Sequence, residues 1–328
     1  MTNSYERPSN MLYDALSDAL AQLRPIHCLS AGLRAGGAWS LRFAAPDGIK
    51  FNTVLSGHAW VWVDGVAPIR LEEGDCFLLT KRRPFHLASA PDLPPEDAEP
   101  IYATATDGVA TCGTGKGFFL VGGRFAFDED VARLVFDPLP PILAVSTAEA
   151  EAPVLRWALT ELRRELAARA LGGALMTDTL GQIMLVQVLR LHARTAPGGG
   201  LIGALADPRI GRAVNLVHRE PAARWTLARL SAEAGMSRSA FAARFAELLG
   251  QPPASYVRRW RMILARQMLQ AGDAGLDEIA ARLGYGSASA FGIAFAKEVG
   301  ASPGRWRVEN GATRRPSSVP APLLERPA

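Results

Sequence analysis

Residues 227–253 read LARLSAEAGMSRSAFAARFAELLGQPP, and residues 276–303 repeat this pattern as LDEIAARLGYGSASAFGIAFAKEVGASP. Eight positions match when one residue is inserted into the turn of the second copy. The matched residues are Leu227, Leu230, Ala234, Gly235, Phe241, Phe245, Gly250 and Pro253, followed in the second copy by Leu276, Ile279, Leu283, Gly284, Phe291, Phe295, Gly300 and Pro303. A repeat of this kind predicts two copies of one structural unit.

Each copy is predicted to form a short helix, a glycine-containing turn and a second helix, which is the plan of a helix-turn-helix. In the first copy we expect Leu227 and Leu230 to face the core. Gly235 supplies the positive φ that a sharp turn needs. Ser237 follows the turn, and its hydroxyl can cap the second helix. The segment is therefore expected to be all-α with two helix-turn-helix motifs.

Burial of Phe241 and Phe245, four residues apart on one helical face, leaves the opposite face of the second helix outward. If each second helix enters a major groove, the outward side chains lie nearest the base edges. The predicted DNA-binding residues are Arg238, Ser239, Ala242, Ala243 and Arg244 in the first copy and Ser287, Ala288, Ser289, Gly292 and Ile293 in the second. Arg238 suits a guanine or a phosphate contact; the alternative is that it only aids solubility.

The copies are joined by PASYVRRWRMILARQMLQAG, residues 253–272. Roughly 19 helical residues would span about 28 Å, close to the 34 Å of one turn of B-DNA. This linker could hold both recognition helices in successive major grooves. Arg258 and Arg259, together with Arg261 and Arg266, suit phosphate contacts that set register. A solvent-exposed, salt-bridged helix face explains the same arginines equally well.

Charge supports a polyanionic partner for this part of the chain. Between Pro208 and Asn310 there are 15 Lys and Arg against 8 Asp and Glu, whereas the net charge of all 328 residues is only +4.

The length and the 48% hydrophobic content allow two domains. No run of some 18 uncharged apolar residues occurs and the start, MTNSYERPSN, lacks a signal-peptide pattern, so no membrane partner and a cytoplasmic, nucleoid-associated location are expected. Cys28, Cys76 and Cys112 are too widely spaced for paired metal ligation and are interpreted as buried thiols.

The N-terminal part has a different residue pattern. Residues 13–23 have helical apolar spacing. The chain then breaks into short runs rich in β-formers, which predict an antiparallel sandwich or barrel. These runs are WSLRF, FNTVLSG, AWVWVDG, IRLEEGD, CFLLT and GFFLVGG. In AWVWV, Trp60 and Trp62 share one face of the strand and Ala59, Val61 and Val63 share the other.

Helical periodicity returns at residues 148–194, where two helices joined near Leu171-Gly172-Gly173 are expected to form a hairpin. TAPGGG, residues 195–200, breaks the pattern. We therefore predict an α+β chain with a barrel domain at 1–147, the hairpin at 148–194, a linker at 195–207, a DNA-binding domain at 208–310 and a disordered tail at 311–328. The hairpin's apolar stripes could pack on the barrel or form a dimer contact.

The run that starts at DPRIGRAVNLVHREPAARW, continues through the first copy and ends at ASYVRRWRMILARQML resembles the AraC/XylS family of bacterial transcriptional regulators, as does the following run IAARLGYGSASAFGIAFAKEVGASPGRWR. The resemblance implies a seven-helix unit bound to promoter DNA, a homodimer, and RNA polymerase as a partner if the protein is an activator. In the N-terminal part, the runs FNTVLSGHAWVWVDG, IRLEEGDCFLLTKRRPFHLAS and FFLVGGRFAFD, followed by LPPIL before the hairpin, are similar to the cupin-like sensor domain of such regulators. This resemblance implies a small-molecule effector. The chain departs from the family pattern at Ala243, Gly292 and Ile293, where Arg or polar residues are usual, so DNA shape and phosphate contacts are expected to carry more of the specificity.

Three roles remain open for the barrel. It could bind an effector in a pocket lined by Trp39, Arg42, Trp60, Trp62 and His86, although the tryptophans could equally fill the core. It could act only in dimerisation. It could be a metalloenzyme, but it has no His-x-His pair, and Asn52 and Thr53 stand where a ligand Glu would be sought, so we predict no metal, no cofactor and no catalytic residue.

Overall fold

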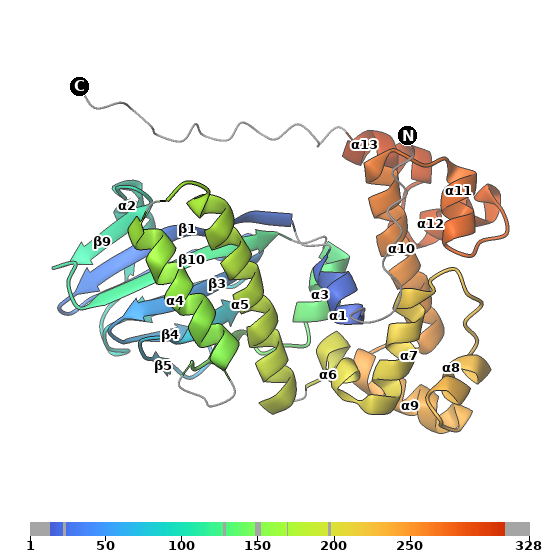
Figure 1. Cartoon of the computed structure of the whole chain (residues 1–328), viewed down its shortest axis with the longest axis horizontal. Helices are drawn as coiled ribbons and strands as arrows, with labels where there is room; N and C mark the ends of the chain where they lie inside the picture. Colours follow the sequence, from blue (N-terminus) through green and yellow to red (C-terminus); the bar gives the residue numbers. More distant parts are fainter. Residues whose placement is uncertain are drawn as a thin grey trace. The chain divides into compact units, whose positions relative to one another are not determined.

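The computed structural model describes residues 14–21, 24–126, 129–147, 152–168, 170–195 and 198–311. The chain divides into two compact units, one made mainly of Leu16–Pro208 and one made mainly of Arg209–Glu247 and the described residues from Gln251 onward (Figure 1). The predicted tail beyond Gly311, the side chain of Cys28 and the start of the first predicted helix lie outside the described residues.

The first unit contains two stacked β-sheets. The six-stranded sheet has the order β11-β6-β3-β10-β1-β9, and the five-stranded sheet has the order β5-β4-β7-β2-β8. The strands are β1 (Arg24–Gly36), β2 (Ser40–Phe43), β3 (Ile49–Ser56), β4 (Ala59–Val63), β5 (Ile69–Leu71), β6 (Cys76–Leu79), β7 (Phe85–Ala88), β8 (Glu96–Asp97), β9 (Val109–Gly113), β10 (Phe118–Ala126) and β11 (Ile142–Val145). The predicted strand-rich, cupin-like first domain is therefore confirmed.

The strands pair mostly antiparallel, as predicted, and the two pairs at sheet edges, β1–β9 and β2–β8, are parallel. Two short helices, α2 (Ala98–Ala103) and α3 (Glu129–Phe136), also interrupt the strands. The core between the sheets is apolar and includes Phe77, Phe85 and Phe118. Of the predicted buried thiols, Cys76 and Cys112 are buried and free.

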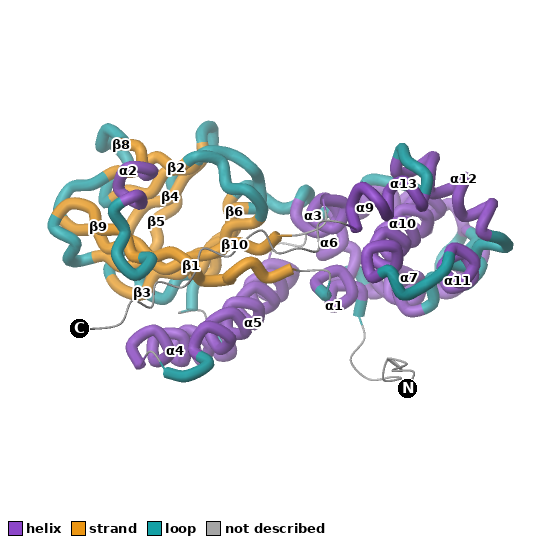
Figure 2. The backbone as a smooth tube through the Cα atoms, turned by 90° about the horizontal axis from the view of Figure 1, so that it is seen from above, coloured by secondary structure: helices purple, strands orange, loops and turns teal. Residues whose placement is uncertain are grey.

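A helical hairpin follows the strands. Its helices are α4 (Pro153–Ala168) and α5 (Gly173–Thr195), and they lie beside β1, across the six-stranded sheet from the five-stranded one (Figure 2). The predicted hairpin is confirmed. The segment expected to be a linker contains a buried helix, α6 (Gly200–Ala206), which packs against α3 and α5. Its run of small and aliphatic residues is short, so the adjacent glycines masked it in the sequence pattern.

The second unit is all-α. Its helices are α7 (Pro208–Arg219), α8 (Leu227–Glu233), α9 (Arg238–Leu249), α10 (Pro253–Ala271), α11 (Leu276–Arg282), α12 (Ala288–Val299) and α13 (Pro303–Gly311). The predicted 19-residue connecting helix is confirmed in α10, which ends at Gly272 with φ +77°. Another helix, α1 (Ala15–Leu20), precedes the strands. Among the helices of the described residues, none is long and apolar enough to cross a membrane.

Aromatic packing anchors α10 at the centre of this unit. The His218 ring stacks on Trp260 with centroids 3.8 Å apart, and its Nε2 lies 2.7 Å from the Tyr256 hydroxyl. These three side chains are buried. One prediction about the core is wrong: Leu230 is buried, but Leu227 is 41% exposed because it occupies the first turn of α8.

Candidate nucleic-acid interface

The two helix-turn-helix motifs position α9 and α12 in the same way. Gly235 and Gly284 both adopt positive φ, at +62° and +75°. The Ser237 hydroxyl accepts a hydrogen bond from the Ala240 amide at 3.3 Å. In the second motif the Ser287 hydroxyl accepts one from the Ala290 amide at 3.1 Å. These caps satisfy otherwise unpaired amides of the first turn, so each recognition helix starts at a fixed residue.

The one-residue insertion predicted for the second turn is confirmed, because α8 and α11 start 49 residues apart whereas α9 and α12 start 50 residues apart. Phe241 and Phe245 are fully buried, and so are Phe291 and Phe295. The ring centroids within each pair are 5.4 and 5.6 Å apart. Since the inner faces match, the two helices turn equivalent faces to the solvent.

The predicted base-reading residues lie on or beside those outer faces. In the first motif Arg238, Ser239 and Ala243 are exposed, whereas Ala242 and Arg244 are partly buried. The Arg244 guanidinium forms an ion pair with Glu247 at 3.0 Å. In the second motif the exposed members are Ser287, Ser289 and Ile293, and the partly buried ones are Ala288 and Gly292. Arg238 is exposed and has no carboxylate within ion-pair distance among the described residues.

The arginines of α10 serve different purposes. Arg258 pairs with Glu298 at 2.7 Å and is about half exposed, which favours the salt-bridge interpretation. Arg259 and Arg266 are partly buried. Arg261 donates from Nε to the Pro221 carbonyl at 2.8 Å and from Nη2 to the Ala223 carbonyl at 2.9 Å. The predicted phosphate contact of Arg261 is therefore corrected: this side chain holds the loop between α7 and α8.

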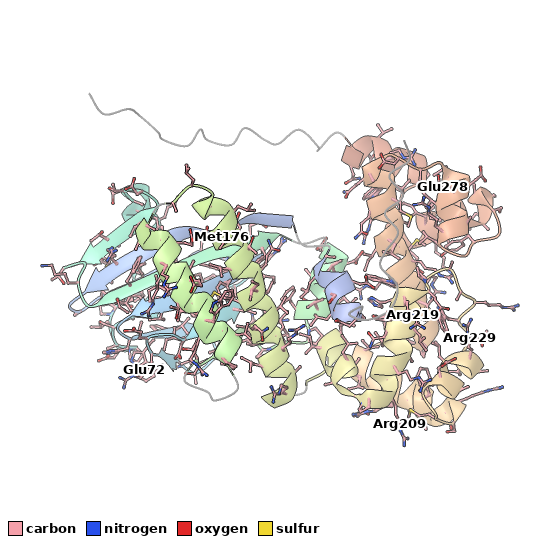
Figure 3. All side chains as sticks on the ribbon, in the orientation of Figure 1. Glu72, Met176, Arg209, Arg219, Arg229 and Glu278 are labelled. Atoms are coloured by element: carbon pink, nitrogen blue, oxygen red, sulfur yellow. The ribbon has the colours of Figure 1, made fainter. Side chains whose placement is uncertain are left out.

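Other basic side chains of this unit were not singled out from the sequence. Arg219 and Arg229, labelled in Figure 3, both lie near Glu220, at 3.2 and 3.7 Å. The Arg229 guanidinium also lies 4.0 Å from the Trp225 ring centroid. Arg224, in the same loop region, is exposed and has no carboxylate partner among the described residues. Their dispersal over a helix end and a loop left no run of basic residues to detect.

The predicted pocket inside the sandwich is not formed by the expected residues. Ala59, Val61 and Val63 belong to the core, so Trp60 and Trp62 project from the opposite face of β4. Arg42 is exposed on that same outer face, paired in register with His86. The His86 ring stacks on Trp62 with centroids 4.9 Å apart, and its Nε2 lies 3.4 Å from Asp64.

Trp39 behaves differently from the other predicted pocket residues. It is 5% exposed and packs against Phe118, with ring centroids 5.2 Å apart. It therefore fills the interior, as the alternative interpretation held. Within the described residues, no group of three or more His, Cys, Asp and Glu side chains is arranged to hold a metal ion.

A cleft of about 780 Å³ lies instead between the hairpin and the outer face of the six-stranded sheet. Leu55 and Phe119 contribute apolar surface from the sheet, and Leu166 contributes it from α4. The Arg34 guanidinium in this cleft lies 4.1 Å from the Phe119 ring centroid. Arg163 donates to Glu73 at 2.9 Å, whereas its buried Nε has no hydrogen-bond partner among the described residues. The cleft thus combines apolar walls with two guanidinium groups.

Similarity to known proteins covers both units. A cupin family profile matches residues 14–194, and a helix-turn-helix domain profile matches residues 230–309. The chain is 44% identical over 297 residues to a protein of Streptomyces lividans named as an AraC-like transcription regulator, covering 90% of this chain and 98% of the relative. It is 27% identical to the HTH-type transcriptional regulator MtrA of Neisseria gonorrhoeae, over 92% of this chain and 99% of that protein.

Among solved structures, the DNA-binding domain of AdpA in complex with a target DNA is 31% identical, with a TM-score of 0.30, over 32% of this chain and 95% of that one. The match to the Streptomyces lividans protein spans both units at an identity that fixes the family. With its cupin and helix-turn-helix parts in that order, the chain belongs to the AraC family of DNA-binding transcriptional regulators.

Proposed function

We propose that the protein binds promoter DNA sequence-specifically, with α9 and α12 in successive major grooves, and thereby regulates transcription on the nucleoid in the cytoplasm. The observation that carries this proposal is the matched pair of recognition helices on either side of α10. This helix has 19 residues, about 28 Å, against about 34 Å for one turn of B-DNA. RNA polymerase would be a further partner if the protein is an activator.

Arg238 and Arg224 would have different tasks on DNA. Arg238 lies in the first turn of α9, where a side chain of a recognition helix reaches base edges, and suits a bidentate contact to guanine. Arg224 lies outside the recognition helix, so it suits a phosphate contact that contributes affinity without sequence information. Discrimination at the first half-site would then depend on Arg238, while both residues would contribute to the salt dependence.

The test of this function is the binding of the full chain to its own upstream intergenic DNA and to random duplex, over a salt series. Tight binding to the upstream DNA with a large ratio over random duplex is expected. An equal affinity for both duplexes at every salt concentration would refute sequence-specific binding.

We also propose that the first unit responds to a small effector, and that the effector binds in the cleft under the hairpin. The interior between the sheets is filled by apolar side chains, whereas the cleft's volume of about 780 Å³ is in the range of small-molecule sites. Arg34 has no carboxylate partner among the described residues and suits an anion. Glu165 and Asp107 also line the cleft and disfavour multiply charged anions, which leaves amphipathic monocarboxylates as the proposed class.

Thermal unfolding with benzoate and hexanoate, compared with the corresponding amides, tests the effector site. A bound effector raises the melting temperature. The carboxylates are expected to stabilise the wild type and Arg82→Ala, which alters an exposed arginine outside the cleft, but not Arg34→Ala. If none of the carboxylates stabilises the wild type, this effector class is wrong.

Dimerisation, the role that would remain for the first unit if it bound no effector, is supported by a different observation. Most of the large apolar side chains that are exposed in the described residues lie on the hairpin: Val154, Trp157, Leu166, Leu171, Leu175 and Met176. Such a concentration is typical of an interaction surface. We propose that this surface joins two copies of the chain. Sedimentation of Trp157→Ser/Leu175→Ser should show monomers where the wild type shows dimers, and Val308→Ser, on α13, serves as the control.

The proposed function includes no enzymatic activity. The cupin-metalloenzyme alternative would require stoichiometric bound metal. Metal analysis of the purified protein decides this point, and a stoichiometric transition metal would overturn the proposal.

A further inference from the structure

Ile293 lies at the centre of the outward face of α12. It is 71% exposed. Ser289, four residues earlier, and Lys297, four residues later, are also exposed, so the three form one stripe along the helix. Phe291 and Phe295 bury the opposite side. The only branched apolar side chain of this stripe therefore points away from the protein.

The residues around Ile293 have little side-chain bulk. A Cβ atom added at Gly286 or Gly292 would meet no atom of the described part of the chain within 4 Å. Ser289 and Ala290 are small and exposed. A helix with so little side-chain bulk in its first turns can bring its backbone close to base edges, and Ile293 is the largest outward side chain of that part of the helix. In α9 the equivalent position is Ala243, so the two recognition helices differ at this point.

Isoleucine has neither a donor nor an acceptor, which restricts what it can read. The thymine C5 methyl is the apolar group that a base pair presents in the major groove. Against guanine or cytosine, the side chain would cover the O6 and N7 acceptors or the N4 donor without replacing their hydrogen bonds to water, at a cost in free energy. An apolar contact at this position can therefore discriminate between base pairs without a hydrogen bond.

We propose that Ile293 reads the C5 methyl of a thymine, so that the half-site bound by α12 is specified by a methyl contact while the half-site bound by α9 is specified by Arg238. This inference rests on the proposed DNA-binding function. It also changes the expectation for the second motif, whose lack of hydrogen-bond donors at Gly292 and Ile293 becomes a distinct mode of direct reading.

The experiment uses the full chain and a duplex that the chain itself selects from a random library. Each thymine of the selected site is replaced in turn by deoxyuridine, which removes the methyl group and keeps the hydrogen-bonding edges. Dissociation constants are measured by fluorescence anisotropy for the wild type, Ile293→Ala and Ile293→Val. Val308→Ala is the matched control, because Val308 is 76% exposed in the same unit but lies on α13. Circular dichroism checks that each variant is folded.

At one or two thymines of the same half-site, removal of the methyl should weaken wild-type binding about fourfold, since one buried methylene-sized group contributes that much. Val308→Ala should show the same ratio of about fourfold between the two dissociation constants, and Ile293→Val should keep most of this ratio. Ile293→Ala should bind the thymine and deoxyuridine duplexes equally. Any effect of deoxyuridine on DNA shape would persist in Ile293→Ala, so this comparison isolates the side-chain contact.

Two failures are distinguishable. If the chain selects a sequence but no deoxyuridine changes wild-type affinity by twofold, or if Ile293→Ala remains as sensitive as the wild type, the methyl-reading proposal is wrong and sequence-specific binding stands. If the chain selects no sequence over random duplex, the proposed function fails, and the methyl-reading proposal fails with it.

Discussion

The equivalent turn glycines of the two motifs should respond very differently to alanine. Gly235 and Gly284 share the left-handed backbone conformation. A Cβ atom at Gly235 would enter open space, whereas one at Gly284 would overlap the carbonyl oxygen and carbon of Ala222. Backbone cannot rotate away as the end of a side chain can. Gly235→Ala therefore measures the conformational cost alone, and Gly284→Ala measures that cost plus a steric one.

The expected magnitudes follow from these two contributions. An alanine in the left-handed region costs roughly 1–2 kcal/mol. Overpacking against neighbouring atoms adds roughly 1–3 kcal/mol. Gly235→Ala should therefore destabilise the helical unit by about 1–2 kcal/mol and Gly284→Ala by about 2–5 kcal/mol. For a unit of this size each kcal/mol lowers the melting temperature by about 4–8 °C.

The two units can unfold separately, so the measurement must follow the helical unit alone. Hydrogen exchange of the α10 backbone amides, resolved by mass spectrometry on the full chain, reports its opening free energy. DNA affinity measured in parallel tests whether the distorted turn also displaces α12. Equal destabilisation by the two substitutions would refute the contribution assigned to the Ala222 contact.

Three further predictions concern charge and burial. Arg238→Ala should lose about 1–3 kcal/mol of binding free energy at the specific site and much less on random DNA, as anisotropy titrations would show. Arg305→Ala alters an arginine of α13 that is paired with Glu309, and it should leave the ratio of specific to random affinity unchanged. Burial raises the pKa of the Cys76 thiol to about 12. At pH 8 the native thiol should therefore react with iodoacetamide far more slowly than the thiol of the unfolded chain, as site-resolved mass spectrometry would show. Rapid labelling of the native protein would contradict the burial of Cys76. Burial, and secondarily Arg124, lowers the pKa of Lys50 from 10.5 to about 8, so charging it in the folded state costs about 3 kcal/mol. The unfolded chain keeps this proton up to pH 10.5. In urea unfolding, Lys50→Met should therefore be more stable than the wild type below pH 8 and should lose that advantage by pH 10.5. A stability difference that does not change with pH would exclude the buried charge of Lys50 as its cause.

Local patterns predicted the helical unit well. The spacing of Phe241 and Phe245, the turn at Gly235 and the cap at Ser237 are all determined within a dozen residues, so the sequence carries them directly. The role of Arg261 could not be predicted, because its carbonyl partners at Pro221 and Ala223 lie about 40 residues away and leave no mark on the helical pattern.

The strand-rich unit was harder to predict in detail. Alternation in AWVWV correctly separates two faces, but it does not say which face meets the second sheet. The large area of Trp60 and Trp62 suggested the interior, whereas the narrow space between the sheets takes the smaller Ala59, Val61 and Val63. The cleft under the hairpin joins residues far apart in the chain, such as Arg34 and Arg163, so no local signal could predict it.

The loop held by Arg261 has a consequence for evolution and protein engineering. Its residue Ala222 leads into the first motif and touches Gly284 in the second, while the Arg261 guanidinium lies 5.6 Å from the Tyr285 ring centroid. The two motifs therefore contact each other through this loop, although their sequences look like independent duplicates. A chimaera that exchanges only residues 276–303 would place a foreign second motif against the original loop, so the two surfaces would not fit each other. Recombination that moves the loop, α10 and both recognition helices together would preserve the contact, so new operator specificities should arise by transfer of the whole unit or by point substitutions on its outer faces.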